Sequence, residues 1–166
     1  DIFTGEIIAM NSSPTFDPNL FLYGVDEKIW ENIKNDPLKP LLNKTVSGLY
    51  SPGSTIKPLV ALSALDNDVI KPNMMVNCEG MVEMYGQKYH CWKKKGHRLM
   101  SLKDAIKQSC DVYFYELARL LGVDRLNLTA QKFGLGKKVL GNVFSNEKKG
   151  IIPSTKWKKE NLGQNW

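Results

Sequence analysis

A sharp turn at Ser51-Pro52-Gly53, followed at once by apolar residues at helical spacing, constrains the fold of this 166-residue chain most strongly. The apolar side chains recur at positions 56, 59, 60, 62 and 65, so we expect a helix from about Ser54 to Leu65. Pro58 is compatible with it because N–H groups in a first helical turn have no intrahelical partner. Ser54 then stands at a helix N-terminus, and Lys57 lies on the same helix face.

The residue patterns in the rest of the chain predict one short strand and several helices. Residues 6–10 have the β-branched apolar run of a strand, residues 12–19 form a loop, and residues 26–48 are mostly irregular with short helical pieces. Ser101 is typical of an N-cap, with Asp104 three residues later. Helices are expected from Asp111 to a stop at Gly122 and over 123–133, and residues 150–166 are expected to be irregular.

The net charge of +6 is compatible with nucleic acid or an anionic membrane surface as a partner. Only three of the 23 basic residues are arginines, although base readout and phosphate binding usually rely on arginine. We therefore interpret the charge as a solvated basic surface and expect no nucleic-acid partner. No stretch approaches the roughly 20 apolar residues that span a bilayer.

The spacing of Ser54 and Lys57 permits nucleophilic chemistry. A hydroxyl at a helix N-terminus lies beside free backbone N–H groups and the positive end of the helix dipole, which favour developing negative charge. A buried Lys57 would lose proton affinity and act as a base on that hydroxyl. The structural alternative stays open, because Ser-x-x-Lys is a common spacing and a serine at a helix start normally serves as a cap.

Residues 50–58, YSPGSTIKP, resemble the nucleophile motif of penicillin-binding proteins. Ser109-Cys110-Asp111 resembles the Ser-x-Asn motif of that family, with Asp in place of Asn. The resemblance implies that Ser54 is acylated, that Lys57 is its base, and that Ser109 relays a proton between Lys57 and the substrate amine. An ionised Asp111 cannot donate to a substrate carbonyl, but it can pair with Lys57. Elongation-type members of the family also carry Asp there.

Other stretches resemble the class B branch of the family. Residues 4–10 and 13–19 look like the opening of its transpeptidase domain, and residues 92–97 and 152–158 are similar to the elongation-type enzyme, penicillin-binding protein 2. The resemblance implies an α/β (α+β) fold shared with serine β-lactamases, in which helices surround an antiparallel sheet.

The third family motif, Lys-Thr-Gly, is absent, since Lys44-Thr45-Val46 lies upstream of the nucleophile. We therefore expect residues 1–166 to be a partial transpeptidase domain that lacks the closing strand. In the family that strand supplies a carboxylate-binding edge and one of two oxyanion-hole N–H groups. Loss of one such donor costs about 10²–10³ in rate, so we expect the chain as given to be a poor or inactive catalyst.

The implied activity is that of a peptidoglycan D,D-transpeptidase, in a periplasmic domain of an inner-membrane-anchored protein that serves cell shape. Ser54 would attack the penultimate D-Ala carbonyl of a stem peptide, terminal D-Ala would leave, and the amine of a neighbouring stem would resolve the acyl-enzyme. β-Lactams would acylate Ser54. The resemblance also implies a membrane glycosyltransferase and elongation-complex proteins as partners, and no organic cofactor.

The three cysteines and one histidine form a second constellation, made up of Cys78, Cys91, His97 and Cys110. Three thiolates and an imidazole are a complete zinc ligand set. They lie in or beside the breaker-rich segment 66–98, a connection long enough to need something that holds it. Penicillin-binding protein 2 is similar in having a metal site in this region. Alternatives are a Cys78–Cys91 disulfide, which an oxidising periplasm favours, three unrelated thiols, or His90 in place of His97.

Three rival functions remain. A β-lactam-hydrolysing enzyme would turn β-lactams over. A catalytically silent sensor module would be acylated and act on a signalling partner. A basic zinc-binding nucleic-acid module predicts strongly salt-dependent binding, and it leaves Ser54 and Lys57 unexplained.

Overall fold

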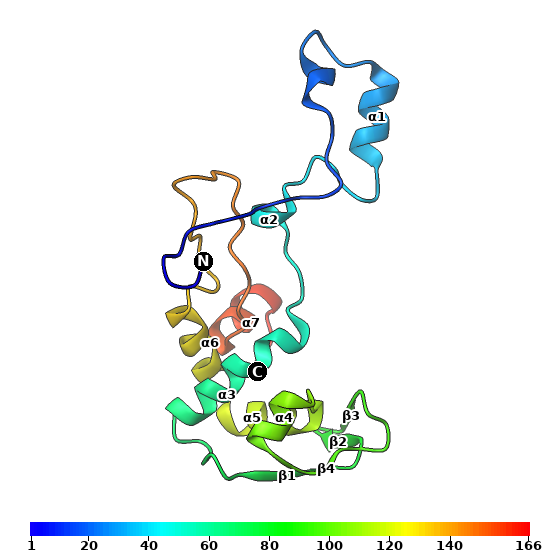
Figure 1. Cartoon of the computed structure of the whole chain (residues 1–166). Coiled ribbons are helices and arrows are strands. Elements are labelled where there is room, and N and C mark those ends of the chain that lie inside the picture. The colour runs from blue at the N-terminus through cyan, green and yellow to red at the C-terminus, as the bar shows by residue number, and fades with distance from the viewer. The chain divides into compact units, whose positions relative to one another are not determined.

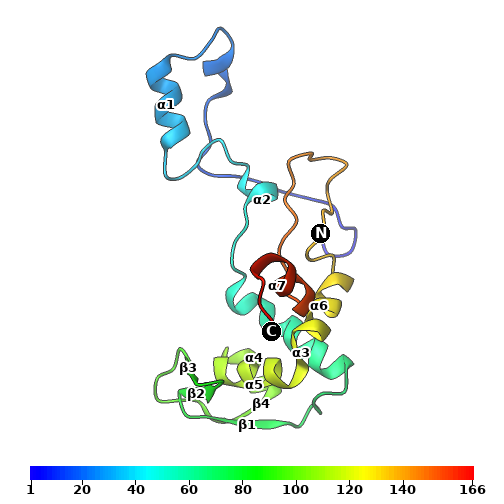
Figure 2. The same ribbon diagram turned by 180° about the vertical axis from the view of Figure 1, so that it is seen from behind.

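The computed structural model describes all 166 residues, which divide into two compact units (Figures 1 and 2). Unit 1 comprises residues 1–50 and 138–149, and unit 2 comprises residues 51–137 and 150–166. Both candidate sites lie in unit 2.

Unit 1 has little regular structure. It contains the 3₁₀ helix η1 (Pro18–Phe21) and the helices α1 (Glu27–Asn35) and α2 (Lys44–Ser47). Each begins at a side chain that accepts a hydrogen bond from a free backbone N–H group, namely Asp17, Asp26 and Asn43. The two segments of the unit are joined by hydrogen bonds, one of them from the Lys148 N–H to the Val46 carbonyl at 2.9 Å.

The strand expected at residues 6–10 was wrong. These residues belong to no ladder, and Ile7 and Ile8 are exposed. A β-branched run forms a strand only where another strand satisfies its backbone groups, and no partner lies beside this one.

Helices build the core of unit 2. They are η2 (Gly53–Ile56), α3 (Lys57–Asp66), α4 (Leu102–Lys107), α5 (Asp111–Leu121), α6 (Val123–Lys132) and α7 (Thr155–Leu162). In both views α3 lies beside α5, and α3 also packs on α6. The helix expected at 54–65 is confirmed, with its first turn wound as a 3₁₀ helix. The stop at Gly122 is confirmed too, and its φ of +77° explains the glycine.

Four short strands form two antiparallel pairs in the segment that lacked helical periodicity. Strand β1 (Met75–Cys78) pairs with β4 (Arg98–Ser101), and β2 (Met81–Met84) pairs with β3 (Gln87–His90). Tyr85 and Gly86 join β2 to β3 with positive φ at both positions, as a two-residue type I′ turn requires. The mixture of helices and antiparallel strands agrees with the expected fold class.

The irregular tail expected at 150–166 was also wrong, because α7 occupies residues 155–162. Ser154 caps it by accepting the Trp157 N–H at 3.0 Å. Asp124 of α6 accepts the Thr155 N–H and hydroxyl, each at 2.8 Å. A carboxylate 31 residues away thus stabilises the first turn of α7. A pattern within residues 150–166 could not predict this contact.

Ser101 gives a direct test of capping. Its hydroxyl accepts the Asp104 N–H at 3.2 Å and donates to the Asp104 carboxylate at 2.6 Å. We expect Ser101→Ala to lower the free energy of unfolding by about 1 kcal/mol in urea titrations, because the first turn of α4 loses its acceptor. Ser101→Thr keeps the acceptor, so an equal loss in that variant would contradict the capping role.

Candidate active site

Three side chains from two distant segments form a hydrogen-bonded row. The Lys57 amine donates to the Ser109 hydroxyl at 2.9 Å, and the Ser109 hydroxyl donates to the Ser54 hydroxyl at 3.0 Å. Ser54 is exposed in η2, whereas Lys57 is only 8% exposed. The expected neighbours are brought together, but the structure forms no direct hydrogen bond between Lys57 and Ser54. Ser109 lies between them.

Asp111 completes this row at its buried end. Its Oδ1 accepts from the Lys57 amine at 2.5 Å, and its Oδ2 accepts the Trp92 N–H at 2.9 Å. Burial raises the pKa of Asp111, but these two hydrogen bonds and the charge of Lys57 outweigh it, so the pKa lies below its usual value. Asp111 is therefore an ionised partner of Lys57 at neutral pH.

Ser109 has an unusual backbone conformation at the junction of α4 and α5. Its φ is +53°, in the left-handed region that residues other than glycine rarely adopt. The Ser109 carbonyl accepts a further hydrogen bond from the Lys57 amine at 2.9 Å. The left-handed turn thus directs both oxygens of Ser109 toward Lys57. Disfavoured conformations of this kind cluster at functional sites.

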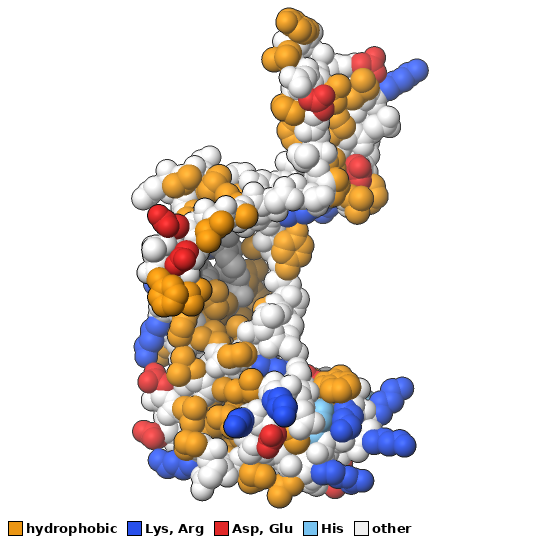
Figure 3. Space-filling view, in the orientation of Figure 1, with side chains coloured by type: hydrophobic (Ala, Val, Ile, Leu, Met, Phe, Trp, Pro, Cys, Tyr) orange, Lys and Arg blue, Asp and Glu red, His pale blue; other side chains and the backbone are white.

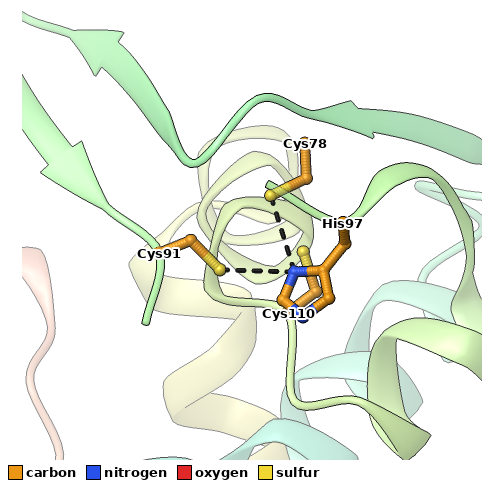
Figure 4. A group of neighbouring side chains, drawn as sticks. All are labelled: Cys78, Cys91, His97 and Cys110. Atoms are coloured by element: carbon orange, nitrogen blue, oxygen red, sulfur yellow. Dashed lines mark hydrogen bonds between the residues drawn. The ribbon is translucent and has the colours of Figure 1, made fainter. Parts of the chain in front are cut away.

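A second group of side chains converges on one buried point beside this row (Figure 4). The ligand atoms of Cys78, Cys91, His97 and Cys110 all lie within 4.8 Å of one another. His97 Nδ1 is 3.7 Å from the Cys78 sulfur and 3.5 Å from the Cys91 sulfur. All three cysteines are free thiols. His90 lies outside the group, exposed, with its carbonyl accepting the Tyr115 hydroxyl.

The donor set fits a zinc ion. Ligands on tetrahedral arms of about 2.3 Å lie about 3.8 Å apart, which is close to the two distances from His97. Burial, followed by the charge of Lys93, lowers the pKa of His97, so the imidazole is neutral as a metal ligand must be. Its Nε2, which would carry the proton, is buried without a hydrogen-bond partner.

The thiols differ in their proton affinity. Burial raises the pKa of Cys78, but hydrogen bonds from the His97 and Gly80 backbone outweigh it, so that pKa lies below the usual value. Burial raises the pKa of Cys110 to about 12. A bound cation would therefore displace a proton from Cys110. Lys and Arg side chains gather over the part of unit 2 that holds β1–β4 (Figure 3).

Two glycines that the sequence analysis did not single out allow backbone segments around the cysteines to approach one another closely. A Cβ on Gly96 would lie 2.1 Å from the Cys78 carbonyl oxygen, and one on Gly80 would lie 2.0 Å from the Lys94 carbonyl oxygen. Both also have positive φ. The signal in the sequence was a glycine directly before His97 and another two residues after Cys78.

If the four side chains bind zinc, Gly96→Ala is expected to weaken that binding by about 10–100-fold, because the new methyl group pushes the His97 loop away from Cys78. Competition with a chromophoric zinc chelator measures this. Gly86→Ala is the matched control, since Gly86 has a φ of +74° and open space around its Cβ. Equal losses in both variants would show that backbone strain, rather than the close approach, causes the effect.

Comparisons with known proteins identify the family. The family model described as penicillin binding protein transpeptidase domain matches residues 1–165. Peptidoglycan D,D-transpeptidase MrdA of Acinetobacter baumannii is 38% identical over 98% of this chain, and MrdA of Escherichia coli K12 is 37% identical over 98%. The alignments cover 24% and 26% of these relatives, so the chain spans about a quarter of their length.

Solved structures agree in fold. PBP2 of Pseudomonas aeruginosa in complex with WCK 5153 superposes with a TM-score of 0.89 at 42% identity, over 98% of this chain and 37% of that one. PBP2 of Helicobacter pylori in complex with MreC gives 0.84 at 33% identity, over 94% and 29%. The chain belongs to the penicillin-binding protein transpeptidase family, as a member of the penicillin-binding protein 2 type.

Proposed function

We propose that this chain carries the nucleophile of a peptidoglycan D,D-transpeptidase, which cross-links stem peptides through an acyl-enzyme on Ser54. The observation that carries the proposal is the continuous row from Asp111 through Lys57 and Ser109 to Ser54. An exposed hydroxyl linked through a second hydroxyl to a buried amine is an arrangement for moving a proton off a nucleophile. The MrdA relatives bear the name of this activity.

The row suggests how the proton moves. When Lys57 has given up one proton, its amine accepts the Ser109 hydroxyl proton while Ser109 accepts the proton of Ser54. Ser54 Oγ then bonds to the penultimate D-Ala carbonyl carbon. The same route in reverse returns the proton to the leaving D-Ala amine. A neighbouring stem amine afterwards attacks the acyl-enzyme and gives its proton to Ser54. Asp111 keeps the Lys57 amine in place throughout.

Acylation by a β-lactam tests the assignment. Intact-mass spectrometry should show one adduct, and Ser54→Ala should remove it. Ser51→Ala is the matched control, because Ser51 lies in the same turn and outside the hydrogen-bonded row. The experiment uses the 166-residue chain and a chimaera that extends it with the segment that follows the matching region in the Acinetobacter relative. An adduct on neither form rejects the proposal, and rapid release of the adduct points to a hydrolase.

The setting of the intact protein belongs to the same proposal. We place this chain in the periplasmic part of an inner-membrane protein of the elongation machinery, with a glycosyltransferase as partner. The support is that one solved neighbour is a PBP2 with MreC and another is a peptidoglycan synthase complex. Within these 166 residues, every helix is too short or too polar to cross a bilayer. Co-purification of the tagged intact protein with an MreC homologue tests the partner.

We also propose that Cys78, Cys91, His97 and Cys110 hold one structural zinc ion. Four protein ligands leave no open position, as is typical of structural rather than catalytic zinc. Metal analysis of the purified chain should give one zinc per chain, and Cys110→Ser should reduce it. The competing disulfide predicts two thiols fewer under denaturing conditions without reductant, and no zinc.

A further inference from the structure

Trp92 lies between the cysteine cluster and the Ser54–Lys57 row, and neither motif contains it. It directly follows Cys91 in the chain. Its indole Nε1 donates to the carbonyls of Gln108 and Ser109, each at 3.1 Å. Its backbone N–H donates to Asp111 Oδ2 at 2.9 Å. One residue therefore binds the backbone of Ser109 and the carboxylate of Asp111.

The hydrogen bond to Ser109 falls on a strained position. Ser109 has a φ of +53°, and this conformation directs its hydroxyl at Ser54. A disfavoured backbone conformation persists only where its surroundings hold it. The Ser109 carbonyl has two donors, the Lys57 amine at 2.9 Å and the Trp92 indole at 3.1 Å. Lys57 loses and regains a proton during the reaction, whereas the indole keeps its N–H. The indole can therefore donate to the Ser109 carbonyl at every stage.

Trp92 does not act as a core residue. It is 64% exposed, so filling space does not account for it. Its ring meets the His97 imidazole edge to face, with centroids 5.3 Å apart and planes at 67°. The indole thus contacts His97 of the cluster on one side, while its N–H donates to the Ser109 carbonyl in the second motif. A phenylalanine would keep the ring contact but not the donor.

We propose that Trp92 is a positioning residue of the acylation site. Its indole N–H holds Ser109 in the left-handed conformation that aims the Ser109 hydroxyl at Ser54. Its backbone N–H holds Asp111 against Lys57. Trp92 makes its hydrogen bonds to Ser109, Asp111 and Gln108 rather than to Ser54 or Lys57, so it acts through Ser109 and Asp111. The inference rests on the proposed transpeptidase function, which it deepens.

The sharpest test replaces the indole N–H by sulfur. Trp92→benzothienylalanine keeps the shape and the contact with His97, and Trp92→Phe is a second variant without the donor. The same analogue at Trp30 in unit 1 is the control. In NMR of the 166-residue chain, we expect the carbon shifts and the H–N–Cα–H coupling of Ser109 to move toward an ordinary negative φ in both Trp92 variants, and not in the control.

Acylation kinetics give the second readout, on the form that the mass experiment finds reactive. We expect the first-order acylation constant for a fluorescent penicillin to fall roughly three- to tenfold, the size of one hydrogen bond. The half-saturating concentration and the zinc content should stay the same, and the melting temperature should fall by no more than the roughly 2–4 °C that the loss of one hydrogen bond produces. Positioning of a nucleophile affects the chemical step rather than ground-state binding.

Several other results would contradict the positioning role of Trp92. Unchanged Ser109 couplings in the benzothienylalanine variant overturn the inference, and so does an unchanged acylation constant. Loss of zinc, or a fall in melting temperature well beyond that of one hydrogen bond, in that isosteric variant assigns Trp92 a packing role and also overturns the inference. If the unsubstituted protein is never acylated, the proposed function fails, while the NMR comparison still shows whether the indole holds Ser109.

Discussion

Lys57→Met is expected to lower the rate of β-lactam acylation at Ser54 by about 10²–10⁴-fold, the usual contribution of a positioned acid–base group. The methionine side chain fills a similar volume but cannot carry a proton. Ser109 then has no base behind it, and its hydroxyl can only exchange hydrogen bonds with Ser54. Stopped-flow measurements with a fluorescent penicillin, on the form that the mass experiment finds reactive, report this rate.

The same substitution should also destabilise unit 2, because it leaves the Asp111 carboxylate without its cation. Breaking a fully buried pair costs about 3–5 kcal/mol, and the cost here should be smaller because the Asp111 side chain is 22% exposed. The double variant Lys57→Met/Asp111→Asn removes the stranded charge. We expect it to recover most of the stability and none of the acylation.

Comparing acylation with stability in these two variants distinguishes a catalytic role of Lys57 from a structural one. Acylation within tenfold of the original rate in Lys57→Met would remove Lys57 from the proton route. Recovery of acylation in the double variant would show that the single variant lost activity only through the unpaired carboxylate of Asp111.

Removal of the proposed zinc ion is expected to have the second large effect. If free zinc exceeds its dissociation constant 1,000-fold, binding stabilises the folded chain by about 4 kcal/mol. For a chain of this size that corresponds to a fall in melting temperature of roughly 8–16 °C when a chelator is added. Calorimetry with and without chelator measures it, and re-addition of zinc should restore the original transition.

The segment between α3 and α4 is the part of the chain that this ion would hold in place. The segment contains two ladders of four-residue strands, and isolated two-stranded ladders are only marginally stable in water. The four ligands link this segment to the start of α5. Cys91→Ser should reproduce the effect of the chelator. If a reductant lowers the melting temperature and a chelator does not, a disulfide holds the segment instead.

Several elements of this protein could be predicted from local patterns in the amino-acid sequence. Helical spacing after the Ser51-Pro52-Gly53 turn located α3, Ser101 marked the start of α4, and Gly122 marked the end of α5. Motif resemblance led to the family. The four candidate metal ligands were recognised by their chemistry, because thiols and imidazoles are few in this chain.

Other features depend on partners that are distant along the chain, and these became visible only in the folded molecule. Residues 6–10 had the composition of a strand but no partner strand, whereas α7 begins with help from Asp124, 31 residues before Thr155. His97 rather than His90 joined the cysteines because the β1–β4 pairing brings its loop to Cys78. Ser109 came to stand between Lys57 and Ser54, 52 residues after Lys57, through a left-handed turn that no periodicity predicts. Hydrogen bonds and close packing between remote segments select these arrangements. Periodicity and local motifs in the sequence do not predict which remote segments will meet.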